Sequence, residues 1–171
     1  DRGTPFVGVL YAGLAMTSRG VRVIEFNARF GDPETQVVLD QLITPLGEFL
    51  FAGATGQLGS FPELQWEGGF SVTVVVSAHG YPPQPRTGDV ISGIEAAEDL
   101  GDLTVYHSGT QVKDGNLVSS GGRVLSVTAH ADTLAEARER ALAGAALIEL
   151  AGSHYRGDIA QRAADGLIAI P

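Results

Sequence analysis

The stretch Val23–Leu39, VIEFNARFGDPETQVVL, decides how the first part of the chain is organised. Its opening residues have the composition and alternation of a β-strand, so Glu25 and Asn27 share one face. Ile24 and Phe26 occupy the other face, which we expect to belong to the core. The strand therefore presents a carboxylate and an amide at its carboxyl end, about 6.5–7 Å apart at Cα.

The residues after this strand predict a loop and then a helix. Arg29 supplies a planar fork suited to a carboxylate or a phosphate, and Gly31 permits backbone geometry that other residues resist. Asp32 and Pro33 are a typical helix start, with Asp32 as the N-cap and Pro33 in the first helical position. Taken alone, Asp32 is better interpreted as a cap than as a catalytic group.

Glu25 and Asn27 together are candidate metal ligands. Hard cations such as Mg²⁺ prefer oxygen donors and often combine few protein groups with substrate phosphates. The chain has no cysteine and only four histidines, so a site for a soft metal is not expected. The alternative is a solvated strand face, which is the commoner role for such a pair.

Composition excludes several classes of function. The 20 acidic residues outnumber the 11 basic ones, which argues against a nucleic-acid partner. Neither a signal peptide nor a continuous apolar run long enough to cross a membrane is evident, so no membrane partner is expected and the cytoplasm is the default location. The length of 171 residues fits one ordinary domain or two small ones.

The rest of the chain alternates strands and helices. We expect a hairpin of strands 6–16 and 21–27, then helices 33–43 and 45–51, with a domain boundary near residue 67. Beyond it we expect strands at 70–78, 90–91, 103–107 and 123–129, a hairpin turn at 113–116, a helix from the cap Thr133 to 151, and a last short helix after Ile159. The predicted fold class is α+β, antiparallel strands covered on one side by helices.

Gly121-Gly122-Arg123 stands at the entrance to the last predicted strand. The glycines would let the backbone approach a ligand, and Arg123 would supply a fork for a phosphate. The alternative is an ordinary loop with a solvated Arg123. His107 is interpreted as structural, as are Tyr155, Arg156 and Asp158, which we expect to dock the last helix.

The motif VIEFNARFGDPETQ, with the preceding GVLYAGL, resembles the signature region of the phosphoribosylamine–glycine ligase family, within the ATP-grasp superfamily. The resemblance implies that Glu25 and Asn27 bind Mg²⁺ or Mn²⁺ and that Arg29 meets the acyl-phosphate end of the reaction. Many members of the superfamily carry a further acidic ligand on the preceding strand. Tyr11-Ala12-Gly13 offers none, so no third ligand is carried over.

The same resemblance implies a domain organisation. Residues 1–67 would be the C-terminal part of an ATP-grasp domain with its metal site, and residues 68–171 the family's C-terminal domain. The chain would then correspond to the C-terminal two-fifths of the family's polypeptide. We expect the remainder of the same polypeptide, the N-terminal and ATP-lid domains, as its partner.

The implied reaction joins glycine to 5-phosphoribosylamine at the expense of ATP, in de novo purine biosynthesis. Arg29 and Asp32 are the candidate catalytic residues, with Asp32 holding an amine. Arg123, Gly122 and Gly31 are the candidate substrate-binding residues, with Arg123 at the 5′-phosphate. The alternatives are a non-catalytic fragment or interaction module, and a sister ATP-grasp ligase with another substrate. We expect this chain to be inactive alone.

Overall fold

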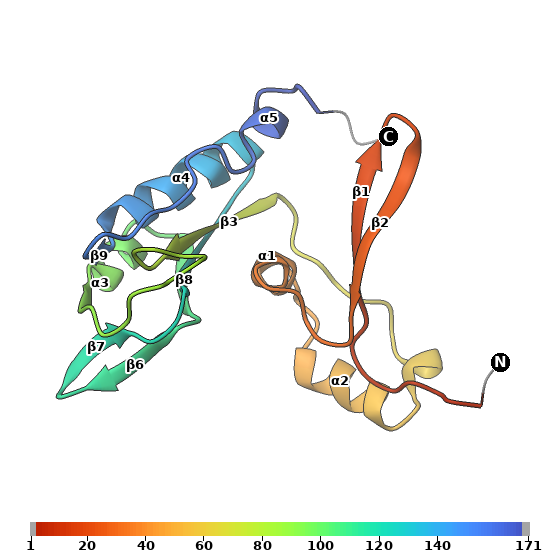
Figure 1. Ribbon diagram of the computed structural model, residues 1–171. Coiled ribbons are helices and arrows are strands. Elements are labelled where there is room, and N and C mark those ends of the chain that lie inside the picture. The colour runs from red at the N-terminus through yellow and green to blue at the C-terminus, as the bar shows by residue number, and fades with distance from the viewer. Residues whose placement is uncertain (1–2, 169–171) are drawn as a thin grey trace. The chain divides into compact units, whose positions relative to one another are not determined.

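The computed structural model describes residues 3–168, which form two compact units (Figure 1). The first unit runs to Glu67 and the second begins at Gly68. The two N-terminal residues of the first predicted domain and residues 169–171 of the second lie outside the described residues. The described residues combine helices with strands that pair antiparallel, so the predicted α+β class is confirmed.

The first unit begins with the predicted hairpin. Its strands pair antiparallel, with Tyr11 opposite Asn27, and the register shifts between Gly13 and Leu14. The first strand starts later than expected, because the residues before Tyr11 lie beyond the end of the partner strand. The strands are β1 (Tyr11–Thr17) and β2 (Gly20–Asn27).

The expectation that Ile24 and Phe26 face a core is wrong for the described chain. Their side chains are 71% and 60% exposed. The reason is that β1 and β2 form a two-stranded sheet, and a two-stranded sheet buries little without another layer. Alternation correctly predicted which residues share a face, but it did not predict what covers that face.

The helices of the first unit are shorter than the predicted ranges or displaced from them. The chain leaves the first helix at Asp40 because Leu42 bridges to Trp66 and the Ile43 amide donates to the carbonyl of Gln65 at 3.0 Å. Those backbone bonds replace the helical ones that a continuation would need. The elements are α1 (Glu34–Asp40), α2 (Leu46–Ala54) and the short 3₁₀ helix η1 (Leu58–Ser60).

The second unit is built on a three-stranded antiparallel sheet. The strand order is β3-β8-β5, so the longest strand is central and paired on both sides. Among its aligned residues, Val74, Val127 and Val105 form one row across the sheet. The strands are β3 (Phe70–Ser77), β5 (Leu103–His107) and β8 (Arg123–Ala131).

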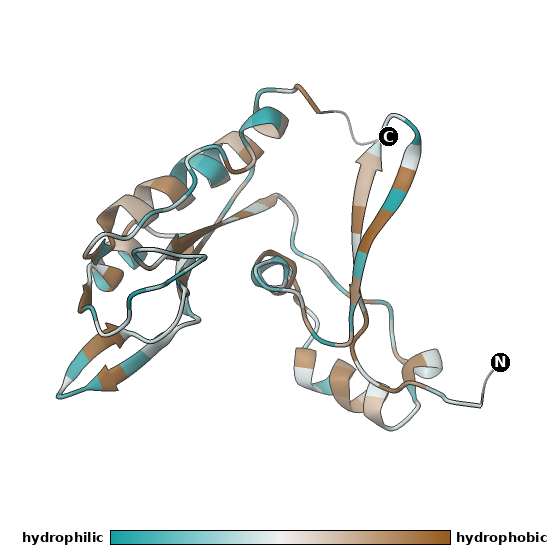
Figure 2. Ribbon diagram, in the orientation of Figure 1, coloured by the Kyte–Doolittle hydropathy of each residue, from teal (hydrophilic) through white to brown (hydrophobic). Residues whose placement is uncertain are grey.

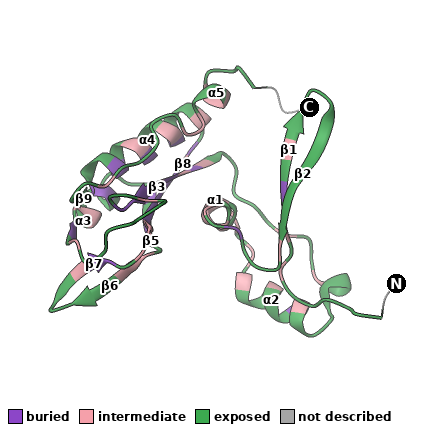
Figure 3. Cartoon of the chain, viewed as in Figure 1, coloured by how far each residue is buried: buried purple, intermediate pink, exposed green. Residues whose placement is uncertain are grey.

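Helix α4 (Leu134–Leu147) packs on one face of this sheet. A Cβ placed on Gly144 would lie 2.4 Å from Leu103 Cδ1 and 3.0 Å from Val127 Cγ1, so the glycine allows the helix to approach closely. The helix contributes Ala137, Ala141 and Ala145 to the buried core. Figure 3 shows that most buried residues lie in this unit. Figure 2 shows hydrophobic residues along α4 and β3.

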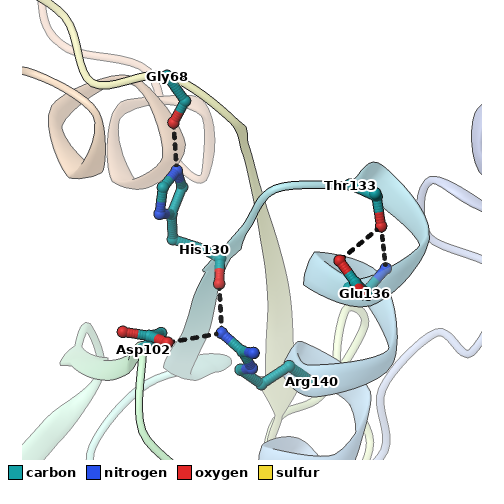
Figure 4. A network of polar contacts seen from close by, with 6 residues as sticks. All are labelled: Gly68, Asp102, His130, Thr133, Glu136 and Arg140. Carbon is teal, nitrogen blue, oxygen red and sulfur yellow. Dashed lines mark hydrogen bonds and ion pairs between the residues drawn. The ribbon is translucent and has the colours of Figure 1, made fainter.

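The predicted cap of α4 is confirmed. Thr133 Oγ1 accepts from the backbone amide of Glu136 at 3.2 Å and donates to its carboxylate at 2.8 Å (Figure 4). The helix ends at Leu147 rather than at residue 151, because the next residues form β9 (Glu149–Leu150) against β4 (Ile91–Ser92).

Smaller elements complete the second unit. The predicted hairpin turn is confirmed, with positive φ at Asp114 (49°) and Gly115 (78°) between β6 (Thr110–Lys113) and β7 (Asn116–Ser119). Helix α3 (Ile94–Glu98) was not predicted, and Glu98 accepts a hydrogen bond from the Val105 amide on the outer strand β5 at 3.1 Å. The last helix is α5 (Gln161–Ala164).

A polar network fixes the start of the second unit on its sheet (Figure 4). His130 Nε2 lies 2.7 Å from the carbonyl oxygen of Gly68. Arg140 of α4 donates from Nη1 to the His130 carbonyl at 2.6 Å and to Asp102 at 3.1 Å. The first residue of the unit is thereby held by the end of β8, and β8 by the helix. No helix within residues 3–168 combines the length and apolarity needed to cross a membrane.

Candidate functional site

The carboxyl end of β2 brings together the two candidate metal ligands. The amide of Asn27 donates from Nδ2 to Glu25 Oε1 at 3.0 Å. Glu25 lies opposite Gly13 on β1, where an added Cβ would be 3.2 Å from Glu25 Cγ, so the glycine makes room for this side chain. Glu25 is exposed and Asn27 is half-buried, which leaves the pair accessible from solvent.

A third oxygen-bearing residue, Tyr11, lies next to this pair. It stands opposite Asn27 in the strand register. Partial burial, the carboxylate of Glu34 and then that of Glu25 raise the pKa of the Tyr11 phenol above its ordinary value. Negative charge is therefore concentrated where β2 ends and α1 begins, as expected for a site that attracts a cation.

The loop that follows β2 is held by its own contacts. Arg29 donates from Nη1 to the Phe30 carbonyl at 2.7 Å, and the backbone of Gly31 accepts from the amide of Thr35 at 3.3 Å. Gly31 is buried, and an added Cβ would meet Glu34 Oε2 at 2.5 Å. Its lack of a side chain thus allows the turn to fold back on the first residue of α1.

The prediction that Asp32 caps this helix is wrong. The N-cap is Pro33, without a side-chain cap, and Asp32 Oδ1 instead accepts from the Gln36 amide at 3.2 Å. An Asp caps a helix only when its oxygen reaches the amides of the first turn, and here it is turned toward a side chain one turn further on. Asp32 remains exposed beside the loop.

Glu25 and Asn27 fit a hard divalent cation by their donor chemistry. Both offer oxygen, and the assignment of the amide's oxygen and nitrogen depends on its partner, so a cation in place of the hydrogen bond would favour the flipped amide. Among residues 3–168, histidines and carboxylates form no cluster of three or more that could hold a metal. The candidate metal site therefore consists of two possible ligands, Glu25 and Asn27, with Tyr11 beside them.

In the second unit, Arg123 is the first residue of β8. It pairs with Ser77, next to a shift in register between Val76 and Ser77 on β3. Its Nε–H donates to the hydroxyl of Tyr81 at 3.1 Å. Tyr81 was not among the candidate site residues from the sequence, so its contact with Arg123 was missed.

Two further loops meet at the entrance to β8. An added Cβ on Gly109 would lie 2.6 Å from the carbonyl oxygen of Arg123 and 2.9 Å from the Cα of Gly121. Ser120 donates its backbone amide to the Gly109 carbonyl at 2.7 Å. His107, at the end of β5, bonds through Nδ1 with Thr110 Oγ1 at 3.0 Å, which agrees with a structural role.

The expected docking role of the closing segment needs correction. Arg156 and Asp158 pair with each other at 2.9 and 2.7 Å, and that pair lies exposed; it also lowers the pKa of the Asp158 carboxyl. Arg138 of α4 makes the contact with this segment, donating to the carbonyls of Ile159 at 2.9 Å and Gly157 at 2.5 Å. Sequence patterns contain no signal for a bond from a helix side chain to a distant backbone carbonyl.

The first unit also contains an apolar cavity of about 520 Å³. Its walls include Phe6, Val38, Phe49 and Trp66, so it is formed by the segment before β1, by α1 and α2, and by the end of the unit. The residues before Tyr11, predicted as strand, therefore line this cavity instead.

Two solved structures share the fold of this chain. N5-carboxyaminoimidazole ribonucleotide synthetase from Thermotoga maritima shares the fold at a TM-score of 0.57 with 18% identity, over 84% of this chain and 37% of that chain. Phosphoribosylamine–glycine ligase from the same organism is more similar, with a TM-score of 0.72 and 34% identity over 88% of this chain and 36% of that chain.

Family models define the membership. The model for the ATP-grasp (A) domain of phosphoribosylglycinamide synthetase matches residues 1–35, and the model for the C domain of the same synthetase matches residues 71–162. The chain therefore belongs to the phosphoribosylglycinamide synthetase family.

Relatives named phosphoribosylamine–glycine ligase match nearly the whole chain. The Streptomyces coelicolor protein is 59% identical over 95% of this chain and 40% of its own length. The Mycobacterium tuberculosis protein is 52% identical over 99% of this chain and 39% of its own length. The chain thus spans about two-fifths of the length of these relatives.

Proposed function

We propose that the polypeptide carrying this chain is an ATP-dependent carboxylate–amine ligase that joins glycine to 5-phosphoribosylamine. The observation that carries the proposal is the identity of 59% over 95% of the chain with a relative named for this reaction. ATP phosphorylates the glycine carboxylate, and the amine of 5-phosphoribosylamine then attacks the glycyl phosphate. Glycinamide ribonucleotide, ADP and phosphate are released, a step of de novo purine biosynthesis that we place in the cytoplasm.

Glu25 and Asn27 are the proposed ligands of Mg²⁺ or Mn²⁺. Their 3.0 Å contact puts both oxygen-bearing groups on one side of β2, and the carboxylate of Glu34 adds to the negative charge around them. A divalent cation bound there supplies charge neutralisation to the phosphates of ATP. The protein's own part is to present that cation at a strand end, since a strand holds its side chains more rigidly than a loop does.

Arg29 and Asp32 are the proposed catalytic residues of the adjoining loop. Arg29 already donates one bond to the Phe30 carbonyl, which restrains the side chain while other N–H groups of the fork serve the acyl phosphate. Asp32 accepts from Gln36, and a carboxylate has acceptor capacity for more than one donor, so it can hold an amine. Gly31 contributes the backbone that lets this loop turn.

Arg123 and Gly122 are the proposed contacts for the substrate's 5′-phosphate. Arg123 is half-buried at the start of β8, and partial burial strengthens its interaction with an anion. We assign residues 1–67 to the C-terminal part of the ATP-grasp domain and residues 68–171 to the family's C-terminal domain. The N-terminal and lid domains of the relatives would supply the rest of the ATP site.

The proposal is tested by substituting Glu25 in the full-length polypeptide that carries these residues. Glu25→Gln keeps the shape and removes the charge, so we expect kcat for ADP formation to fall about 100-fold or more with the protein still folded. Glu48→Gln, an exposed carboxylate on α2, is the matched control and should retain parental kcat. Parental kcat in Glu25→Gln would remove the metal role from this residue.

The 171-residue chain alone should release no ADP from ATP, glycine and 5-phosphoribosylamine. The full-length polypeptide should release it only when all three are present with Mg²⁺ or Mn²⁺. Formation of ADP with another acid or amine in place of glycine or 5-phosphoribosylamine would point to a sister ligase instead.

A further inference from the structure

Tyr81 lies on the turn that joins β3 to the rest of the second unit. The Ala78 amide donates a hydrogen bond to the Gly122 carbonyl at 2.8 Å. The Ala78 carbonyl in turn accepts one from the Tyr81 amide at 3.2 Å. These two bonds tie the turn to the residue before β8. Tyr81 is therefore held beside Arg123 by backbone contacts, although the two residues are far apart in sequence.

The ring of Tyr81 fills the space where Gly122 has no side chain. A Cβ built on Gly122 would lie 2.2 Å from Tyr81 Cδ2 and 2.6 Å from Cε2, far inside van der Waals contact. The requirement for glycine at this position is thus explained by a protein side chain. The ring is half-buried, which limits its movement.

The hydroxyl of Tyr81 accepts a hydrogen bond from Nε of Arg123 at 3.1 Å. A guanidinium is planar, so fixing the direction of its Nε–H also fixes the plane in which its Nη groups lie. Phosphate recognition by arginine depends on that plane, because the two oxygens and the two N–H groups must be coplanar to form parallel bonds.

We propose that Tyr81 is the positioning residue that orients Arg123 toward the anionic end of the substrate. The inference rests on the proposed function, in which Arg123 binds the 5′-phosphate of 5-phosphoribosylamine. Tyr81 itself touches no substrate in this account. Its hydroxyl preorganises the guanidinium, so its effect on binding passes entirely through Arg123.

The test compares Tyr81→Phe, Arg123→Gln and the double variant in the full-length polypeptide. Tyr81→Phe keeps the ring on Gly122 and removes only the bond to Nε. We expect the KM for 5-phosphoribosylamine and the inhibition constant of ribose 5-phosphate to rise about threefold to tenfold. The kcat and the KM values for ATP and glycine should stay at parental values. The double variant should show the same two constants as Arg123→Gln alone, since Tyr81 acts through that residue.

Tyr155→Phe is the matched control, because it removes a phenol hydroxyl from a residue outside this turn and should leave every constant unchanged. A raised KM in Arg123→Gln with none in Tyr81→Phe would overturn the role of Tyr81 and leave the proposed function standing. Additive losses in the double variant would overturn it as well. If Arg123→Gln itself leaves the KM unchanged, the phosphate assignment fails and the positioning role fails with it.

The two proposals fail in distinguishable ways. If the parent polypeptide forms no ADP from the three substrates, the proposed function is wrong. The positioning role of Tyr81 is then tested separately, by measuring the binding of ribose 5-phosphate directly by calorimetry. Weaker binding of ribose 5-phosphate in Tyr81→Phe than in the parent would support the positioning role. Equal binding would end it.

Discussion

Substitution of Gly122 by alanine tests how the entrance to β8 is built. The added Cβ would fall 2.2 Å from a ring carbon of Tyr81, whereas comfortable carbon contacts are about 3.5–4.0 Å apart. The ring must therefore move by more than about 1 Å, or the backbone must shift. Overpacking of this kind costs about 1–3 kcal/mol. For a unit of roughly 100 residues, such a loss lowers the melting temperature by about 5–20 °C.

The loss of stability on substitution by alanine should depend on how much space surrounds each glycine. Gly121 would bring its Cβ only to 3.3 Å from the Cα of Gly109, so Gly121→Ala should cost less than Gly122→Ala. Gly157 has nothing within 4 Å and is the matched control, so Gly157→Ala should leave the melting temperature within about 2 °C of the parent.

Thermal unfolding of the 171-residue chain, followed by circular dichroism, measures all three variants. Adding Tyr81→Ala to Gly122→Ala removes the clashing ring, so the double variant should lose less than the sum of the single losses. A Gly122→Ala protein as stable as Gly157→Ala would refute the reasoning, because it would mean that Tyr81 does not occupy the space beside Gly122.

Three further predictions concern the core, a helix cap and a phenol. Leu125→Ala, at a fully buried side chain of β8, should lower the free energy of unfolding by about 2–5 kcal/mol in urea titrations; a loss under about 1 kcal/mol would contradict its central place in the core. Thr133→Ala should cost about 1 kcal/mol in the same assay, and Thr133→Ser, which keeps the hydroxyl, should cost less. Glu34→Gln should bring the raised pKa of Tyr11 down toward its ordinary value, as followed by NMR of labelled tyrosine. Because the folded-state pKa of Tyr11 is raised, its contribution to stability is complete below its unfolded pKa near 10 and is lost as the pH rises from there through the folded value, so the total high-pH loss should be smaller in Glu34→Gln and should end at a lower pH.

Local signals in the sequence predicted a good part of this fold. The alternation of Val23–Asn27 placed Glu25 and Asn27 on one face, where they meet at 3.0 Å. Asp114-Gly115 predicted a turn because two positive φ angles are needed there, and Thr133 predicted a cap because its hydroxyl reaches an amide one turn on. In each case the physical cause lies within a few residues of the signal.

Long-range contacts account for what was missed. Strand β9 ended α4 early by pairing with β4, almost sixty residues away, and the helical pattern of α4 contains no trace of that partner. The bond between Tyr81 and Arg123 is of the same kind. Asp32 matched the local pattern of an N-cap, yet the helix begins at Glu34 with Pro33 at the N-cap position, and the Asp32 carboxylate accepts a hydrogen bond from Gln36 instead.

The bond from Glu98 to the Val105 amide has a consequence for association between molecules. Strand β5 is the outer strand of its sheet, and an outer strand offers unpaired amides that another chain can use to extend the sheet. Here a carboxylate occupies one of those amides in the middle of the strand and brings a negative charge to that edge. A strand arriving at this edge would have to displace the carboxylate from that amide and would meet its negative charge. Helix α3, although it is short, thereby hinders the pairing of β5 with a strand of another molecule.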